Sequence, residues 1–124
     1  MPKSKILIAD DNVPNVELLE AYLDGLDCEI AVAVDGRDTL AKVAEFQPDL
    51  ILLDVMMPGI DGGEVAAKIK EDKRLANIPV VFLSAIVKKE ETQPTGGNIG
   101  GLTFLAKPVK LDDLITCIEN HLGK

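Results

Sequence analysis

Residues 50–54 read Leu-Ile-Leu-Leu-Asp, a wholly apolar run that ends directly in a carboxylate. Residues 5–11, Lys-Ile-Leu-Ile-Ala-Asp-Asp, have a similar form near the start of the chain. Apolar runs of this length without alternation are typical of strands that are buried on both faces. Three further runs, at residues 29–34, 79–83 and 102–106, complete a set of five predicted strands.

Segments with apolar residues at helical spacing lie between these strands and after the last one. Their predicted buried faces are Val16, Leu19, Leu23 and Leu26 in the first helix, Leu40, Val43 and Ala44 in the second, Val65, Ala66 and Ile69 in the third, and Leu111, Leu114, Ile115, Ile118 and Leu122 in the last. Pro48 is expected to end the second helix. Strands that alternate with helices predict a doubly wound parallel sheet covered on both faces, so we expect one α/β domain over residues 1–124.

Residues 88–98 interrupt this pattern because they contain no hydrophobic residue. Pro94, Gly96 and Gly97 within this stretch oppose helix formation. We therefore expect the helix between the fourth and fifth strands to be shortened or mobile.

The composition excludes several classes of protein. Acids outnumber bases by 21 to 13, and the net charge of −8 repels a phosphate backbone, so we expect no binding to nucleic acid. No apolar run approaches the ~18 residues of a membrane helix, and the start does not resemble a signal peptide, so we expect a cytoplasmic location without membrane association. Cys28 and Cys117 are expected to be reduced packing residues, and His121 suits the end of the last helix.

Polar side chains follow the strands at the edge where parallel strands end. Asp10 and Asp11 follow the first strand, Asp54 the third, Ser84 the fourth and Lys107 the fifth. Each alone is typical of a turn or cap, but ligands of such sheets bind at this edge. Clustered carboxylates repel one another unless a cation compensates, and Mg²⁺ favours carboxylate, water and phosphate oxygens. A metal, an ammonium group and a hydroxyl around one carboxylate predict a Mg²⁺-dependent site where that carboxylate accepts a phosphoryl group.

The same positions carry a resemblance to a known family. The motifs are Asp10-Asp11, Asp-Val-Met-Met-Pro-Gly-Ile-Asp-Gly at residues 54–62, Ser84-Ala85 and Lys107-Pro108. On these motifs the chain, from residue 5 to about residue 122, resembles the receiver domain of bacterial two-component response regulators of the stand-alone type. The resemblance implies a flavodoxin-like, five-stranded parallel sheet in the order 2-1-3-4-5.

The resemblance also implies a phosphoacceptor and a metal site. Asp54 would accept the phosphoryl group from a phosphohistidine. Asp11 and Asp54 would bind Mg²⁺ directly, together with the backbone carbonyl of Met56, and Asp10 would act through water. Mn²⁺ is the alternative ion.

Further residues take roles in the switch by the same resemblance. Lys107 would pair with the phosphoryl oxygens, and Ser84 would move inward to donate a hydrogen bond to them. The ring of Phe104 would follow Ser84 from an exposed to a buried position. The peptide bond between Lys107 and Pro108 would be cis, a state that is essentially confined to bonds before proline.

The predicted function is a signalling receiver, which catalyses only its own phosphorylation and dephosphorylation. Its expected partners are a sensor histidine kinase or a histidine phosphotransfer protein, and a downstream protein that binds the face of the fourth helix, fifth strand and fifth helix. One alternative is a phosphorelay intermediate that passes the phosphoryl group onward. An aspartyl-phosphate phosphatase would need a second Asp where Met56 stands, and a flavin phosphate would be repelled by Asp10 and Asp11.

Overall fold

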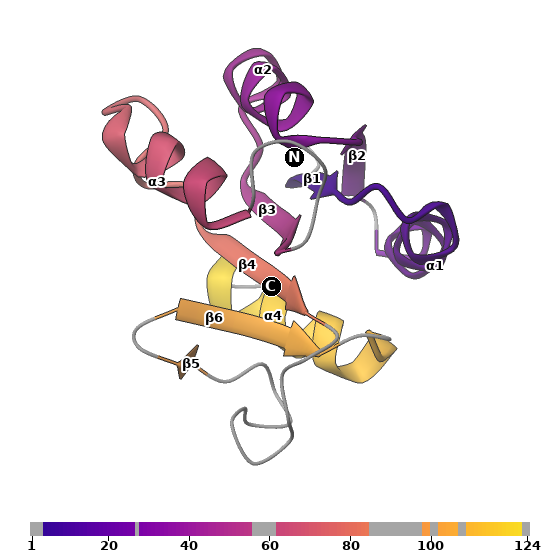
Figure 1. The fold of residues 1–124 in the computed structure, drawn as a ribbon. Helices are drawn as coiled ribbons and strands as arrows, with labels where there is room; N and C mark the ends of the chain where they lie inside the picture. The colour runs from indigo at the N-terminus through magenta and orange to yellow at the C-terminus, as the bar shows by residue number, and fades with distance from the viewer. Residues whose placement is uncertain are drawn as a thin grey trace.

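A six-stranded sheet forms the centre of the molecule (Figure 1). The computed structural model describes residues 4–26, 28–55, 62–84, 98–99, 102–106 and 109–122. The strands are β1 (Ser4–Ala9), β2 (Cys28–Ala33), β3 (Leu50–Asp54), β4 (Val80–Ser84), β5 (Asn98–Ile99) and β6 (Leu102–Ala106). The helices among these residues are α1 (Val13–Asp24), α2 (Gly36–Phe46), α3 (Gly62–Glu71) and α4 (Leu111–Leu122).

The strand order is β2-β1-β3-β4-β6-β5, and the first five of these strands are parallel. The predicted parallel sheet in the order 2-1-3-4-5 is confirmed, with β6 as its fifth strand. The two-residue strand β5 was not predicted, and it pairs antiparallel with β6. The shortened helix predicted over residues 88–98 concerns residues outside the described part of the chain, apart from Asn98, which begins β5.

Helices cover both faces of the sheet, α1 and α4 on one and α2 and α3 on the other (Figure 1). Alternate strand residues point to opposite faces, so two separate cores form. The first core joins residues of α1 and α4 to the sheet: Val16, Leu19, Leu23, Leu114, Cys117 and Ile118 against Ile6, Ile8, Leu50, Leu52, Val81, Leu83 and Leu105. The second core joins Val43, Val65 and Ile69 to Leu7, Ala9, Ile51, Leu53 and Phe82.

Polar side chains fix the starts of α1 and α2. The Asn12 side chain caps α1 by accepting a hydrogen bond from the Asn15 backbone N–H at 2.9 Å. The Asp35 side chain caps α2 in the same way, from Asp38 at 2.8 Å. Helix α2 ends at Phe46, before Pro48 as predicted, and its C-cap residue Gln47 has a left-handed conformation.

Among the predicted helix-face residues whose side chains the structure describes, all but two are buried or half-buried, although Leu26 lies beyond the last residue of α1; the side chain of Leu122 lies outside the described part. Ala44 is exposed, and the buried face of α2 instead includes Thr39, which was not predicted and is fully buried. The Thr39 hydroxyl donates to the Asp35 carbonyl at 2.6 Å, so burial leaves it satisfied. Leu111, at the first turn of α4, is 40% exposed.

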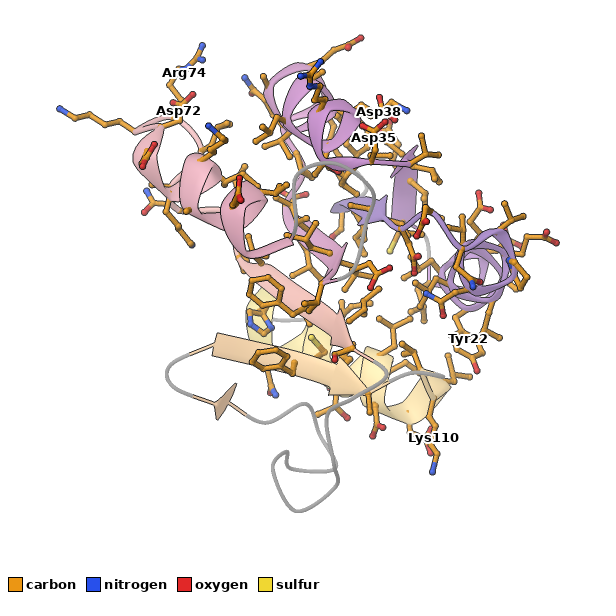
Figure 2. All side chains as sticks on the ribbon, viewed as in Figure 1. Tyr22, Asp35, Asp38, Asp72, Arg74 and Lys110 are labelled. Atoms are coloured by element: carbon orange, nitrogen blue, oxygen red, sulfur yellow. The ribbon has the colours of Figure 1, made fainter. Side chains whose placement is uncertain are left out.

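A long-range hydrogen bond ties α1 to the segment before α4. The Tyr22 hydroxyl donates to the Val109 backbone carbonyl at 3.2 Å. Figure 2 shows Tyr22 above Lys110, the next residue of that segment. Within the described part of the chain, no helix is both long enough and apolar enough to span a membrane.

Candidate functional site

The carboxyl ends of β1 and β3 bring three acidic residues together. Ala9 aligns with Leu53 in the parallel register, so Asp10 and Asp54 follow at neighbouring positions on the same edge of the sheet. One carboxylate oxygen from each of Asp10, Asp11 and Asp54 lies within 4.8 Å of the other two. Asp10 and Asp54 are buried, whereas Asp11 is exposed. The predicted clustering of these three residues is confirmed.

Both carboxylate oxygens of Asp10 accept hydrogen bonds. The Asn12 backbone N–H donates to Oδ1 at 2.9 Å, and the Asn15 side-chain amide donates to Oδ2 at 2.5 Å. The Asp10 backbone N–H in turn donates to the Ala33 carbonyl at the end of β2. Asp10 is therefore fixed both to the sheet and to the first turn of α1.

Asp54 and Ser84 lie at the ends of adjacent strands. Asp54 aligns with Leu83, and the Val55 backbone N–H donates to the Leu83 carbonyl at 3.1 Å. Ser84 is the last residue of β4 and is 5% exposed, as is Asp54. Both side chains are thus held at the same sheet edge, in keeping with their predicted place in one site.

Three of the predicted site residues lie outside the described part of the chain. These are Met56, Lys107 and Pro108. Ser84 aligns with Ala106, so β6 ends next to β4, and Lys107 follows Ala106 in the sequence. The lysine–phosphoryl contact, the carbonyl ligand and the cis peptide remain predictions.

Phe104 is half-buried in β6 and packs on Phe82 of β4. The two ring centroids are 5.4 Å apart, and the ring planes are inclined by 29°. The two rings thus stack between adjacent strands, and the role of Phe104 in a switch stays a prediction.

The chemistry of the acidic cluster fits a hard divalent cation. Oxygen is the donor atom of all three side chains, and each carboxylate carries a negative charge close to two others. Mg²⁺ binds through one or a few carboxylates and keeps several waters, so one exposed and two buried carboxylates suit it. A cation bound among the three carboxylates would relieve the repulsion among them.

The sequence-based interpretation missed the roles of Asn12 and Asn15. The signal available was a cap-forming Asn next to the acidic pair, followed by Pro14, which is favoured at the first turn of a helix. Such a start places the next side chain of the first turn, Asn15, back toward Asp10. The sequence therefore contained a signal for a helix start at the site, but the contact itself is tertiary.

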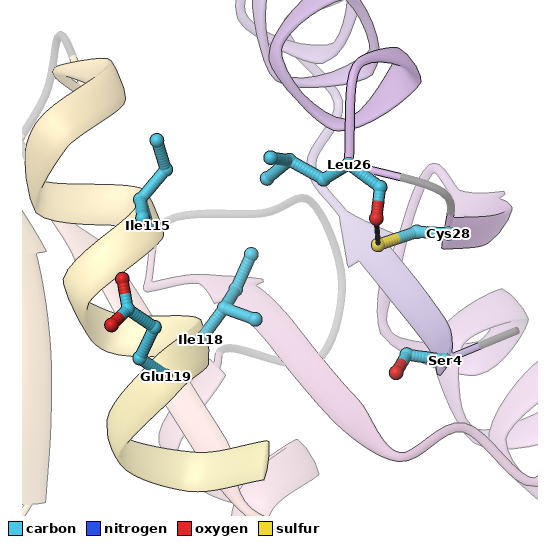
Figure 3. A pocket seen from close by; sticks show the side chains of 6 residues that line it. All are labelled: Ser4, Leu26, Cys28, Ile115, Ile118 and Glu119. Atoms are coloured by element: carbon cyan, nitrogen blue, oxygen red, sulfur yellow. Dashed lines mark hydrogen bonds between the residues drawn. The ribbon is translucent and has the colours of Figure 1, made fainter. Parts of the chain in front are cut away.

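A pocket of about 410 Å³ lies away from this cluster (Figure 3). It is lined by Ser4, Leu26, Cys28, Ile115, Ile118 and Glu119. Figure 3 shows the α4 residues on one side and the three others opposite them. Ser4 and Cys28 are the first residues of β1 and β2, so the pocket lies at the amino-terminal ends of these strands, opposite the acidic cluster at the carboxyl ends.

Comparisons of this chain with known proteins all point to the same family. A family model described as "Response regulator receiver domain" matches residues 6–119. The response regulator PleD of Caulobacter vibrioides is 43% identical over 112 residues, which are 90% of this chain and 24% of that protein. The chain thus spans about a quarter of the length of PleD.

A relative of similar length and a solved structure agree with this match. The polar-differentiation response regulator DivK of Brucella anthropi is 33% identical over 125 residues, covering 99% of this chain and 98% of that protein. The receiver domain of the Francisella response regulator 1452 has a TM-score of 0.81 at 27% identity, with 98% of each chain covered.

Proposed function

Because the chain belongs to the response regulator receiver domain family, we propose that Asp54 accepts a phosphoryl group from a sensor histidine kinase or a histidine phosphotransfer protein. The observation that supports this most directly is the cluster of Asp10, Asp11 and Asp54 at one sheet edge. A carboxylate in this position is a nucleophile for phosphorus, provided that the negative charge around it is compensated. Receiver domains are signalling domains, and we propose that phosphorylation changes the binding of a downstream protein.

The metal site that we propose is made by Asp11, Asp54 and the carbonyl of Met56, with Asp10 acting through water. Both oxygens of Asp10 already accept N–H donors, which favours a contact through water over direct ligation. When bound, Mg²⁺, or Mn²⁺ in its place, would neutralise charge on the phosphoryl oxygens and orient them.

The transfer itself is a displacement at phosphorus. An Asp54 oxygen forms the new P–O bond, the P–N bond of the phosphohistidine breaks, and the electron pair leaves with the imidazole. We assign the contacts to the phosphoryl oxygens to Lys107 and Ser84, and the rearrangement that follows to Ser84 and Phe104. The buried position of Ser84 next to the end of β3 supports its part in this assignment.

We also propose that residues 1–124 form one receiver domain in the cytoplasm. All described strands belong to one sheet, which supports a single domain. Cys28 and Cys117 are both free thiols, which is typical of a reducing compartment. The downstream partner would bind the side of the molecule that carries β6 and α4.

Phosphorylation can be tested with acetyl phosphate and Mg²⁺, followed by intact mass. We expect the wild type to gain one phosphoryl group and Asp54→Asn to gain none. Asp24→Asn is the matched control, because Asp24 is an exposed aspartate at the end of α1. Equal phosphorylation of wild type and Asp54→Asn would refute the assignment, and turnover of a chromogenic phosphate ester would favour a phosphatase instead.

A further inference from the structure

Asn15 stands out because its side chain contacts the acidic cluster without being acidic itself. Its amide donates to Oδ2 of Asp10 at 2.5 Å, and Asp10 is only 1% exposed. We propose that Asn15 is a positioning residue of the metal site, which holds the Asp10 carboxylate in the orientation that binds metal-coordinated water. This inference rests on the proposed function, because it concerns the same metal site.

The need for such a residue follows from the charges. The carboxylates of Asp11 and Asp54 approach that of Asp10 within 4.8 Å, so without a cation they push it away from the cluster. Two hydrogen bonds to different oxygens, from the Asn12 backbone and the Asn15 side chain, fix the carboxylate plane against this repulsion. Groups that orient metal-binding side chains in this way commonly matter to affinity almost as much as the ligands do.

The chemical type of the donor matters as well. A Lys or Arg at position 15 would also donate to Asp10, but its positive charge would cancel the charge that attracts the ion. The neutral amide of Asn15 orients the carboxylate and leaves its negative charge available. A charge-assisted hydrogen bond to a buried carboxylate is also stronger than one between neutral groups.

The structure separates this role from helix capping. The side chain of Asn12 caps α1 by accepting the Asn15 backbone N–H, while the bond from Asn12 to Asp10 uses the backbone of Asn12. Asn12→Ala therefore removes the cap and leaves both donors to Asp10 in place. Asn15→Ala removes the side-chain donor to Asp10 and keeps the cap, because the cap uses only the backbone N–H of Asn15.

The test is the Mg²⁺ affinity of the folded proteins, measured by isothermal titration calorimetry without any phosphodonor. We expect Asn15→Ala to bind Mg²⁺ about tenfold more weakly than wild type. We expect Asn12→Ala to be less heat-stable but to lose less Mg²⁺ affinity than Asn15→Ala, because its backbone N–H and the Asn15 amide can still donate to Asp10. Asn120→Ala, which removes an exposed Asn from α4, should match wild type in both respects.

A double-mutant cycle then tests the route through Asp10. If Asn15 acts by orienting Asp10, then Asp10→Asn and Asp10→Asn/Asn15→Ala bind Mg²⁺ with equal affinity. Wild-type affinity in Asn15→Ala, or the same loss of affinity in both backgrounds, would overturn the inference. Failure of the wild type itself to bind Mg²⁺ would instead overturn the proposed metal site, and the inference with it.

Discussion

Replacing Asp11 by Asn should stabilise the protein in the absence of metal. The Asp11 carboxylate is exposed and lies within 4.8 Å of the carboxylates of Asp10 and Asp54. At that separation each pair of charges repels by about 0.9 kcal/mol in a medium like water and by about 3.5 kcal/mol at an effective dielectric constant of 20. Because Asp11 is exposed, the lower value applies, and the repulsion of Asp11 by Asp10 and by Asp54 adds up to about 2 kcal/mol.

A smaller effect acts in the other direction. Asp11 lies just before α1, whose positive N-terminal end stabilises a nearby carboxylate by about 0.5 kcal/mol. The repulsion is larger, so we expect Asp11→Asn to gain about 1.5 kcal/mol. For a chain of this size that gain raises the melting temperature by about 6 °C.

The assay is thermal unfolding in a chelator at low ionic strength, repeated with saturating Mg²⁺. A ligand at a hundredfold excess over its dissociation constant stabilises the wild type by about 2.7 kcal/mol. The order of stability should therefore reverse with Mg²⁺, because Asp11→Asn removes a side chain that we propose to be a direct ligand. At 1 M salt, where screening acts over about 3 Å, the advantage of the variant should largely vanish.

The matched control is Glu20→Gln, which also removes one negative charge from the net charge of −8 but at an exposed position of α1. It should change neither the metal-free stability nor the response to Mg²⁺ by a comparable amount. Local repulsion would be refuted as the cause if Asp11→Asn were no more stable than wild type in chelator. It would also be refuted if Glu20→Gln raised the stability by the same amount.

Three further outcomes are expected at other positions. Tyr22→Phe should lower the free energy of unfolding by about 1 kcal/mol in urea titrations, because it leaves a backbone carbonyl without its donor. Burial raises the pKa of the Cys117 thiol to about 11, so a thiol reagent at pH 8 should label the half-buried Cys28 first. The stability that the neutral Cys117 thiol contributes is present below its ordinary pKa of 9.0 and is lost as the pH rises toward 11. The side-chain hydrogen bond from Arg74 lowers the pKa of Asp72 below 3.8, so NMR titration should show this shift. Arg74→Ala should reduce the shift but not remove it, because the backbone N–H of residue 74 still donates to Asp72. The associated stability is present above pH 3.8 and is lost as the pH falls.

The sheet and the acidic cluster could be predicted because both depend on strong local patterns. Apolar runs mark buried strands, and parallel strands place their carboxyl ends at one edge whatever the details of the loops. Asp10 and Asp54 follow two such runs directly. Their proximity therefore needed only the correct neighbours for β1 and β3.

Features that depend on tertiary partners could not be predicted in this way. The buried hydroxyl of Thr39 is satisfied by donating to the Asp35 carbonyl, a contact that a pattern of hydrophobic residues does not register. The two-residue strand β5 exists only through its pairing with β6 and begins in a stretch of polar residues. The hydrogen bond from Asn15 to Asp10 depends on how α1 begins relative to the sheet.

The bond between Tyr22 and Val109 has a practical consequence. Tyr22 is the only tyrosine of the chain, and the sequence contains no tryptophan. The tyrosine fluorescence of the protein therefore comes from a single ring, whose hydroxyl donates a hydrogen bond to the backbone of the residue that directly follows Lys107 and Pro108. An optical signal from the unmodified protein thus reports on one contact between α1 and the chain beyond β6, without an attached dye.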